Sequence, residues 1–398
     1  MSKRILFIAP ESFPVNGPEA IVNIKLLRVL SESGYKIDLI SRRHQKGYYP
    51  SNQNLSDYGV SVNRNEIIEV DNKFNISTII SHILTYLKFG TVFRGAHWAY
   101  FAVLIAEKLV IKNHYDFVIT KNAPSFLVGF YLKNKFKCKW IASWNDPYPA
   151  IKYPYPYAKG VDAKLPFFSK RLLNIMEQAD FHVFPNSRLR DYMKKYLNIK
   201  DDSSYEIPHI AVKQNNMHVL ESNILKIVCS GNLKHPRNPN IFLSALSKLT
   251  ELHTDIVVDF VGVFEENLKL EIDKLGLNDY VNLIPPIDYN DSLAILKNYH
   301  VTLIVEANCD EGIFLPTKVG DYMQYGKVIF AISPQNGVLN DLYKDKYIQY
   351  FSSHQSDDVY NELKGLYFDF KNNNLREVNF YNKFSDSSVL EQYKVILG

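Results

Sequence analysis

The residues best suited to chemistry are concentrated between Glu311 and Asp321. Glu311 and Gly312 open a loop, Pro316 follows, and Lys318 and Asp321 then stand one helical turn apart. Backbone N–H groups at a helix start can bind phosphate, Lys318 adds charge, and a carboxylate one turn later can accept hydrogen bonds from ribose hydroxyls. The spacing therefore indicates a nucleotide-phosphate site. A plain ion pair between Lys318 and Asp321 on a surface helix is the alternative.

A second candidate is the basic loop at residues 230–239. It follows a predicted strand and precedes a predicted helix, and α/β domains bind ligands at such carboxyl ends of strands. Lys234 and Arg237 can neutralise a diphosphate, for which the guanidinium offers a planar fork of donors. A solvated basic loop is the alternative, although this loop lies in an otherwise acidic half of the chain.

Two further candidates lie near the start of the chain. Gly17, in the loop at residues 14–18, lets the backbone approach a ligand just before a predicted helix. The loop lacks the GxGxxG dinucleotide motif, and a tight turn is the alternative. Asp146 follows a predicted strand beside aromatic residues, where it can orient or deprotonate an acceptor hydroxyl; the alternative is an Asp-Pro turn. His97 is interpreted as a packed histidine.

Short apolar runs alternate with amphipathic stretches, a pattern typical of parallel strands joined by helices. The predicted strands are residues 4–8, 36–41, 117–120, 140–143 and 181–184, and then 225–230, 256–261, 281–283, 301–305 and 328–332. A polar linker at 213–223 separates the two series. We therefore expect an α/β protein of two doubly wound, Rossmann-like domains, residues 1–212 and 213–385, that face each other across a cleft. A last helix, 386–398, is expected to return to the first domain.

The composition fits a globular protein and excludes disordered, collagen-like and coiled-coil chains. Of 398 residues, 46% are hydrophobic and 22% are charged. The net charge of +4 is unevenly distributed: residues 1–200 hold 29 Lys and Arg against 15 Asp and Glu, and the remainder holds 17 against 27. Halves of opposite sign favour two domains with different partners.

The cysteines and the apolar segments predict a cytoplasmic protein. Cys138, Cys229 and Cys309 are scattered, which favours reduced thiols over disulfides or a zinc site. The N-terminus enters a short strand rather than a signal peptide. No segment reaches the ~18 uncharged apolar residues of a membrane-spanning helix.

Together these motifs resemble the retaining glycosyltransferases of the GT-B fold, specifically glycosyltransferase family 4. The resemblance covers nearly the whole chain and is densest at residues 225–335. Residues 311–316 resemble the EGFGLP loop of that family, and 316–322 its P-x-K-x-x-E-Y variant. Residues 231–239 are similar to its G-x-x-x-x-x-R-x-P loop, and 144–148 to its R-D-P-W segment.

The resemblance implies a role for each matching residue. Arg237 and Lys318 would bind the donor diphosphate, Asp321 the ribose and Glu311 the donor sugar, while Gly17 would let its loop approach that sugar. The implied donor site also includes Gly231, Lys234, Gly312, Leu315 and Pro316. Asp321 replaces the usual Glu of the family, and Glu311 precedes it by ten residues instead of eight.

The implied reaction is transfer of a sugar from a nucleotide diphosphate to a hydroxyl, with retention at the anomeric carbon. Basic side chains would stabilise the leaving diphosphate, so no metal or other cofactor is expected. The expected partners are a nucleotide-sugar donor and a glycan or lipid-diphosphate-linked acceptor of cell-surface polysaccharide synthesis, with no nucleic acid. The alternatives are a hydrolysing nucleotide-sugar epimerase, a two-lobed solute-binding protein and an inactive scaffold.

The basic first half suggests one more partner. Its positive charges, together with the aromatic segments 86–89 and 153–157, suit an anionic membrane at the inner face of the cell. A generally basic soluble domain is the alternative.

Overall fold

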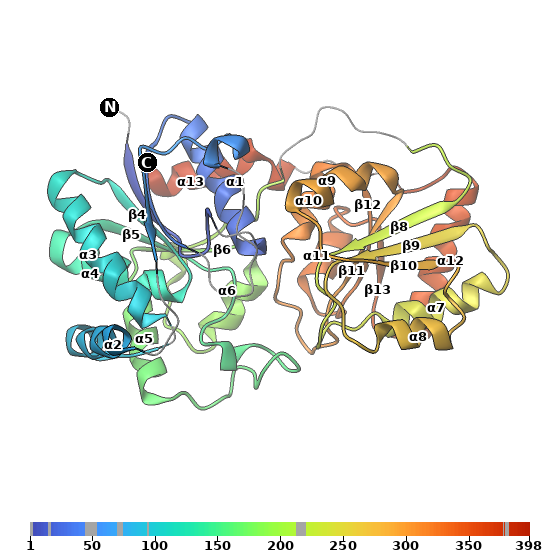
Figure 1. Cartoon of the computed structure of the whole chain (residues 1–398), viewed down its shortest axis with the longest axis horizontal. Coiled ribbons are helices and arrows are strands. Elements are labelled where there is room, and N and C mark those ends of the chain that lie inside the picture. Colours follow the sequence, from blue (N-terminus) through green and yellow to red (C-terminus); the bar gives the residue numbers. More distant parts are fainter. Residues whose placement is uncertain are drawn as a thin grey trace. The chain divides into compact units, whose positions relative to one another are not determined.

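The computed structural model describes residues 3–14, 17–43, 54–69, 75–93, 95–211, 220–376, 378 and 382–398. The chain forms two compact units, each built on a parallel sheet (Figure 1). The first unit comprises Met1–Tyr153, Lys159–Ile210 and Asp386–Gly398, and the second comprises Pro154–Ala158 and Ala211–Ser385. The predicted α/β class with two Rossmann-like sheets is confirmed. Most of the predicted linker, including the boundary at residues 212 and 213, lies outside the described residues.

The first unit has a seven-stranded sheet in the order β3-β2-β1-β4-β5-β6-β7. Its strands are β1 (Arg4–Ile8), β2 (Lys36–Arg42), β3 (Arg64–Ile68), β4 (Phe117–Lys121), β5 (Lys139–Ser143), β6 (Phe181–Phe184) and β7 (Ser204–Glu206). The two edge strands, β3 and β7, are additions to the predicted set. They bury little of their surface, so they lack the apolar run that marks the central strands.

The helices of the first unit are α1 (Pro18–Glu32), α2 (Ile76–Phe89), α3 (Ala96–Lys112), α4 (Ala123–Phe136), α5 (Phe167–Met176), α6 (Ser187–Lys194) and α13 (Asp386–Leu397). Helix α13 packs against α1. The sequence predicted neither α2 nor α3. Helix α3 packs against both α2 and α4. It is apolar over most of its surface, so its sequence lacks a clear helical alternation.

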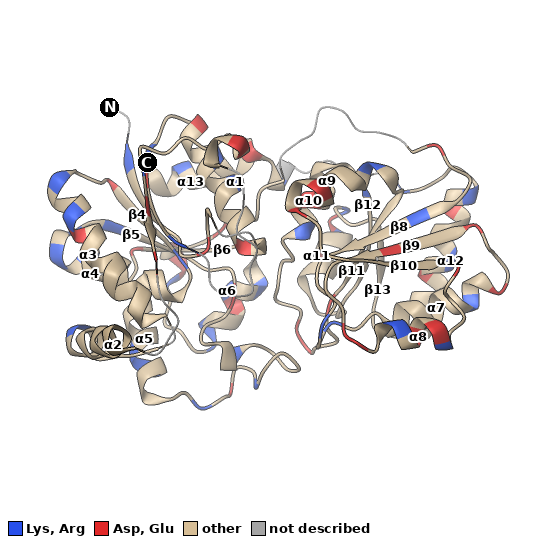
Figure 2. Ribbon diagram, viewed as in Figure 1, with Lys and Arg blue, Asp and Glu red and all other residues tan. Residues whose placement is uncertain are grey.

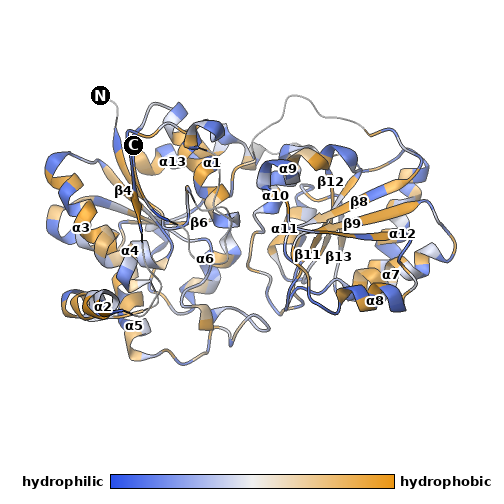
Figure 3. Cartoon of the chain, viewed as in Figure 1, coloured by the Kyte–Doolittle hydropathy of each residue, from blue (hydrophilic) through white to orange (hydrophobic). Residues whose placement is uncertain are grey.

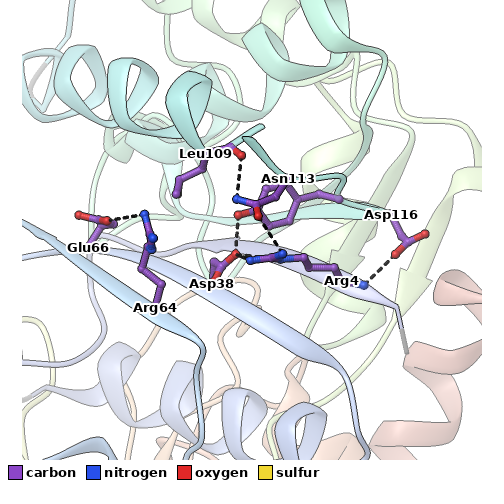
Figure 4. Close-up of polar contacts among 8 residues, drawn as sticks. Arg4, Asp38, Arg64, Glu66, Leu109, Asn113 and Asp116 are labelled. Carbon is purple, nitrogen blue, oxygen red and sulfur yellow. Dashed lines mark hydrogen bonds and ion pairs between the residues drawn. The ribbon is translucent and has the colours of Figure 1, made fainter. Parts of the chain in front are cut away.

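A polar cluster ties the amino-terminal ends of the first strands together (Figure 4). Arg4 of β1 contacts the buried carboxylate of Asp38 in β2 at 2.7 Å and Asn113, which follows α3, at 3.0 Å. The backbone N–H of Arg4 donates to Asp116, just before β4. These contacts lie at the sheet edge opposite to the carboxyl ends, so they hold the strands in register and leave the ligand-binding edge to other residues.

The second unit has a six-stranded sheet in the order β10-β9-β8-β11-β12-β13. Its strands are β8 (Leu225–Ser230), β9 (Ile256–Val261), β10 (Val281–Ile284), β11 (Val301–Val305), β12 (Val328–Ile332) and β13 (Tyr350–Ser352). Five of them were predicted, and the exception is the three-residue edge strand β13. All of the adjacent pairs are parallel.

Each face of this sheet has its own apolar core. Ile227 and Cys229 of β8 face one core, while Val228 between them faces the other. The first core is covered by α7 (Asn240–Thr250), α8 (Leu268–Lys274) and α12 (Ser356–Lys371). The second is covered by α9 (Tyr289–Ala294), α10 (Lys318–Gln324) and α11 (Val338–Lys344). Strands buried on both faces explain the continuous apolar runs in the sequence.

Among the described residues, no helix combines the length and the apolar character that a membrane crossing requires.

Candidate active site

The candidate donor site lies where the strand order of the second sheet reverses. Strand β8 is followed in the chain by its neighbour β9, whereas β11 lies on the other side of β8. Ligands of open α/β sheets bind at this reversal, outside the carboxyl ends of the strands. The loop after β8 carries Gly231, Lys234 and Arg237, and the loop after β11 carries Glu311 and Gly312.

Arg237 is held by an acid that the sequence analysis did not single out. Its Nε donates to Oε2 of Glu306 at 3.1 Å, and Glu306 immediately follows β11. The hydroxyl of Tyr157 donates to the same oxygen at 2.9 Å. The guanidinium also lies over the Tyr157 ring, 5.8 Å from its centroid. Two side chains from distant parts of the sequence, Glu306 and Tyr157, thus fix the position of Arg237.

This arrangement keeps a permanent positive charge at the site. The neighbouring Glu306 carboxylate raises the pKa of Arg237 above its usual value. Burial, and then Glu306, raise the pKa of Tyr157, so its hydroxyl stays protonated and can donate. A guanidinium has five N–H groups, and the bond to Glu306 uses one of them. The remaining N–H groups of Arg237 can donate hydrogen bonds to a phosphate.

Lys318 reaches the same place from the start of α10. A Cβ added to Gly231 would come within 3.2 Å of Lys318 Nζ, so the ammonium lies directly against the Gly231 backbone. Gly231 has φ +119°, a conformation that side chains disfavour. Gly262, after β9, is packed on it: a Cβ there would be 2.3 Å from the Gly231 carbonyl oxygen. The two glycines bring β8, β9 and Lys318 together.

Asp321 and Tyr322 occupy the first turn and the middle of α10. The Asp321 carboxylate accepts a hydrogen bond from the Tyr289 hydroxyl at 2.6 Å. The buried Tyr322 hydroxyl accepts from the backbone N–H of Ser230 at 3.1 Å, and this bond fixes α10 to the end of β8. The register of α10 therefore sets where Lys318 and Asp321 lie.

Gly312, in the loop after β11, forms an isolated backbone bridge with Gly337. Its N–H donates to the Asn336 carbonyl and its own carbonyl accepts from Val338, both at 2.8 Å. A Cβ on Gly312 would lie 3.2 Å from the Cα of Gly337. A small pocket adjoins this bridge, lined among others by Tyr157, Glu306, Cys309, Gly312, Phe314 and Ser333.

The other predicted donor residues differ in their surroundings. Glu311 is half-buried next to Gly312. The Lys234 side chain is exposed, and the Lys234 carbonyl accepts a hydrogen bond from the backbone N–H of Arg237. The Leu315 side chain packs into the core beneath α10, and the buried Pro316 accepts from Val319. Leu315 and Pro316 therefore shape the loop, and a ligand would meet their backbone.

Gly17 and Asp146 belong to the first unit. Gly17 caps α1 with φ −179°, extended backbone that any residue adopts, so only its lack of a side chain distinguishes it. Val15 and Asn16 of the same loop lie outside the described residues. Asp146 is exposed, and its hydrogen bond and charge contribute, after burial, to a raised pKa of Tyr153.

Near Asp146 lie two titratable side chains that the sequence analysis did not identify, the buried Lys121 and the half-buried Glu19. Lys121, at the end of β4, donates to Ser143 Oγ at 2.7 Å. Burial lowers the pKa of Lys121 to about 8, and burial with neighbouring Glu11 raises the pKa of Glu19 to about 8. Asn145 donates to Glu19 at 3.2 Å. The first unit therefore also gathers titratable groups at the carboxyl ends of its strands.

Glu306 and Tyr157 were missed for different reasons. An acid directly after the apolar run 301–305 was a visible signal for Glu306, since strand ends carry ligand-binding residues. Tyr157 gave no such signal, because the segment Pro154–Ala158 belongs to the second unit although the surrounding chain belongs to the first. His97 is buried and its Nδ1 hydrogen-bonds to Ser81, in line with the packed histidine that we expected.

The described ranges contain no group of three or more His, Cys, Asp or Glu side chains placed to hold a metal ion. All three cysteines are free.

Comparison with protein families gives a match in the second part of the chain. Residues 213–363, less than half of the chain, match the family model described as glycosyl transferases group 1. The match spans β8 to α12 and includes every candidate donor residue of the second unit. No curated protein gives a significant sequence match to the chain.

Solved structures resemble the whole chain. The Anabaena protein HepE (Alr3699), in complex with UDP and glucose, has 13% identity and a TM-score of 0.68, with 99% of each chain covered. A sucrose-phosphate synthase from Thermosynechococcus elongatus has 14% identity and a TM-score of 0.66, covering 99% of this chain and 96% of that chain. A UDP-N-acetylglucosamine 2-epimerase has 13% identity and a TM-score of 0.58, covering 100% and 97%.

At these identities the likeness shows the fold, which is the GT-B architecture of two Rossmann-like domains. Together with the family match over residues 213–363, it supports a GT-B glycosyltransferase.

Proposed function

We propose that this protein is a retaining glycosyltransferase that moves a sugar from a nucleotide diphosphate to a hydroxyl of a glycan or lipid-linked acceptor. The observation that carries the proposal is the convergence of two cations on one glycine-lined strand end. Arg237 is fixed by Glu306, and Lys318 lies against Gly231. A leaving diphosphate is the ligand that such a pair of cations suits best.

The residues divide the work between binding and chemistry. Arg237 and Lys318 take up the negative charge that develops on the diphosphate as the bond to the sugar breaks. Asp321, oriented by Tyr289, accepts hydrogen bonds from the ribose. Glu311 contacts the donor sugar and Asp146 orients the acceptor hydroxyl. The charge is neutralised by side chains, so the reaction needs no metal.

The test is an assay with nucleotide sugars and a panel of hydroxyl acceptors, with NMR of the product to read the anomeric configuration. UDP-sugars are the first donors to try, because HepE has been solved with UDP-glucose. R237A and K318A should lower transfer about 100-fold or more while circular dichroism stays unchanged. K269A, which removes an exposed lysine of α8, is the matched control. Undiminished transfer in both site variants would refute the donor site.

A nucleotide-sugar epimerase is the second candidate, because an epimerase of the same fold resembles the chain. Incubation with the donor alone separates the two. Isomerised sugar nucleotide supports the epimerase, and transfer that requires an acceptor supports the glycosyltransferase.

The basic first half of the chain suggests where in the cell the enzyme works. We place the enzyme in the cytoplasm, in the synthesis of cell-surface polysaccharide, peripherally attached to the inner face of the membrane. The excess of basic residues in the first 200 positions supports this attachment, since anionic lipids attract such a surface.

A further inference from the structure

Helix α2 presents its apolar side chains to the outside. Ile76 and Leu87, near its two ends, are 76% and 72% exposed. The exposed set on this helix consists of Ile76, Ile79, Ile80, Ile83, Leu84, Tyr86 and Leu87. Spacings of three, four and seven residues place most of this set on one face of a helix. Figure 3 shows the orange, hydrophobic colouring along α2.

The opposite face of α2, which meets the protein, is mainly polar. Ser81 hydrogen-bonds through Oγ to Nδ1 of the buried His97, and Thr85 Oγ1 donates to the Ala96 carbonyl at 3.4 Å. Phe89 is the one large apolar residue of the helix that is buried. This is the reverse of a helix that packs on its own core and faces water. The exposed face is therefore available for a partner.

The apolar surface continues onto α5. The rings of Tyr86 and Phe168 meet edge to face, with centroids 5.8 Å apart. Thr91, just after α2, donates to the Phe168 carbonyl at 2.8 Å, which fixes the two elements together. Phe167 projects beside them and is 74% exposed. Exposed apolar side chains gathered on two adjoining elements are typical of an interaction site.

The rim of this surface is basic. Neither α2 nor α5 contains an Asp or a Glu (Figure 2). Lys88 is exposed in the last turn of α2, and Lys170 and Arg171 are exposed within α5. A Cβ added to Gly90 would lie 3.5 Å from Arg171 Nε, so this cation stands at the end of α2. An apolar stripe edged by cations and aromatic rings complements the interface of an anionic bilayer. A symmetric contact with a second copy would instead set these cations against each other.

We propose that α2, together with Phe167 and Phe168 of α5, is the surface by which the protein docks on an anionic lipid bilayer. The helix lies in the plane of the interface, its isoleucines and leucines enter the acyl boundary, and Lys88, Lys170 and Arg171 contact the headgroups. The inference rests on the proposed function for the membrane setting and assigns that setting to particular residues.

The test is flotation of the full chain with vesicles of phosphatidylcholine containing phosphatidylglycerol, in low and high salt. Wild type should float with anionic vesicles, and I76S/L87S should reduce its partition about tenfold or more. The matched control is L252S/L270S in the second unit, where the leucines are 73% and 68% exposed; it should float like wild type. K88Q/K170Q/R171Q should remove most of the salt dependence.

Several outcomes would overturn the inference. The first is wild type that does not float with anionic vesicles, and the second is an equal loss of flotation in I76S/L87S and L252S/L270S. The third is a wild-type dimer that becomes monomeric in I76S/L87S while its flotation stays the same. Transfer to a water-soluble acceptor should be the same in I76S/L87S and wild type. A lack of vesicle binding with intact transfer refutes only the docking surface, whereas a lack of transfer in wild type refutes the proposed function.

Discussion

Arg237 and Glu306 form an ion pair at 3.1 Å across the point where the strand order of the second sheet reverses. Arg237 comes from the loop after β8, and Glu306 follows β11, 69 residues later. Glu306 is almost completely buried, whereas Arg237 keeps about a third of its side chain exposed. One end of the pair is thus anchored, and the other can meet a ligand.

This anchoring leads to a prediction for Glu306→Gln. The variant keeps the size of the side chain but removes the charge that orients Arg237, so the KM for the donor should rise about tenfold with a smaller change in kcat. Steady-state kinetics with varied donor concentration measures the changes in KM and kcat separately. Glu265→Gln is the matched control, because Glu265 accepts a hydrogen bond from the N–H of His235 in the same loop. An unchanged KM in Glu306→Gln would contradict the positioning role.

The close approach of Lys318 to Gly231 predicts the behaviour of Gly231→Ala. The new methyl group would strain the backbone at φ +119° and push against Lys318 Nζ, so both stability and donor binding should fall. Gly276→Ala is the control, with φ +67° and nothing within 4 Å of the added Cβ. Each variant should lose about 1 kcal/mol of stability, and only Gly231→Ala should weaken nucleotide binding in calorimetry. Equal binding by the two variants would place Lys318 outside the site.

Asp321 should distinguish ribose from deoxyribose. Its carboxylate can accept charge-assisted hydrogen bonds from ribose hydroxyls, so wild type should bind a ribonucleoside diphosphate about tenfold better than the 2′-deoxy form. Asp321→Asn should lose this preference, and Tyr289→Phe, which removes the orienting hydroxyl, should reduce it less. Titration calorimetry with the two nucleotides gives both ratios. If Asp321→Asn keeps the full preference, the ribose contact lies elsewhere.

His182 predicts a pH dependence of stability in the first unit. Burial lowers the pKa of His182 to about 4, and its Nδ1 accepts a hydrogen bond from Trp144 Nε1 at 3.2 Å, which requires the neutral ring. In the unfolded chain the imidazole takes up a proton near pH 6.5. The unfolded state therefore binds more protons between about pH 6.5 and 4, and the free energy of unfolding falls as the pH drops through this range, by up to about 1.4 kcal/mol per unit.

The measurement uses denaturant unfolding followed by tryptophan fluorescence between pH 7 and 4. Trp98, Trp140 and Trp144 all lie in the first unit, so the signal reports that unit alone. His182→Gln should remove the corresponding part of the slope. A variant with the same pH slope as wild type would show that other groups cause it.

Because Arg237 and Lys318 can neutralise the leaving diphosphate, we expect sugar transfer to be independent of metal ions. Transfer should persist within about twofold in excess chelator, because Arg237 and Lys318 stabilise the diphosphate. Assays with and without EDTA, followed by added Mg²⁺ or Mn²⁺, provide the measurement. A large loss in EDTA that Mn²⁺ restores would contradict this part of the proposal.

The sequence by itself determined the central strands and the order of the two domains. Strands buried on both faces need continuous apolar runs, as in residues 301–305 and 328–332, and such runs are visible in one dimension. It also placed Arg237, Lys318 and Asp321 at strand and helix ends, where parallel α/β domains bind ligands.

Only the tertiary structure decided which residues meet. Glu306 and Tyr157 contact Arg237 across 69 residues or more, and no local periodicity encodes such a contact. The edge strands β3 and β7 exist because a neighbouring strand offers hydrogen bonds, not because their own side chains are buried. Strand β13 is buried but has only three residues, too few to give a pattern in the sequence. Helix α2 was not predicted, and only its packing against α3 shows that its polar face turns inward and its apolar face outward.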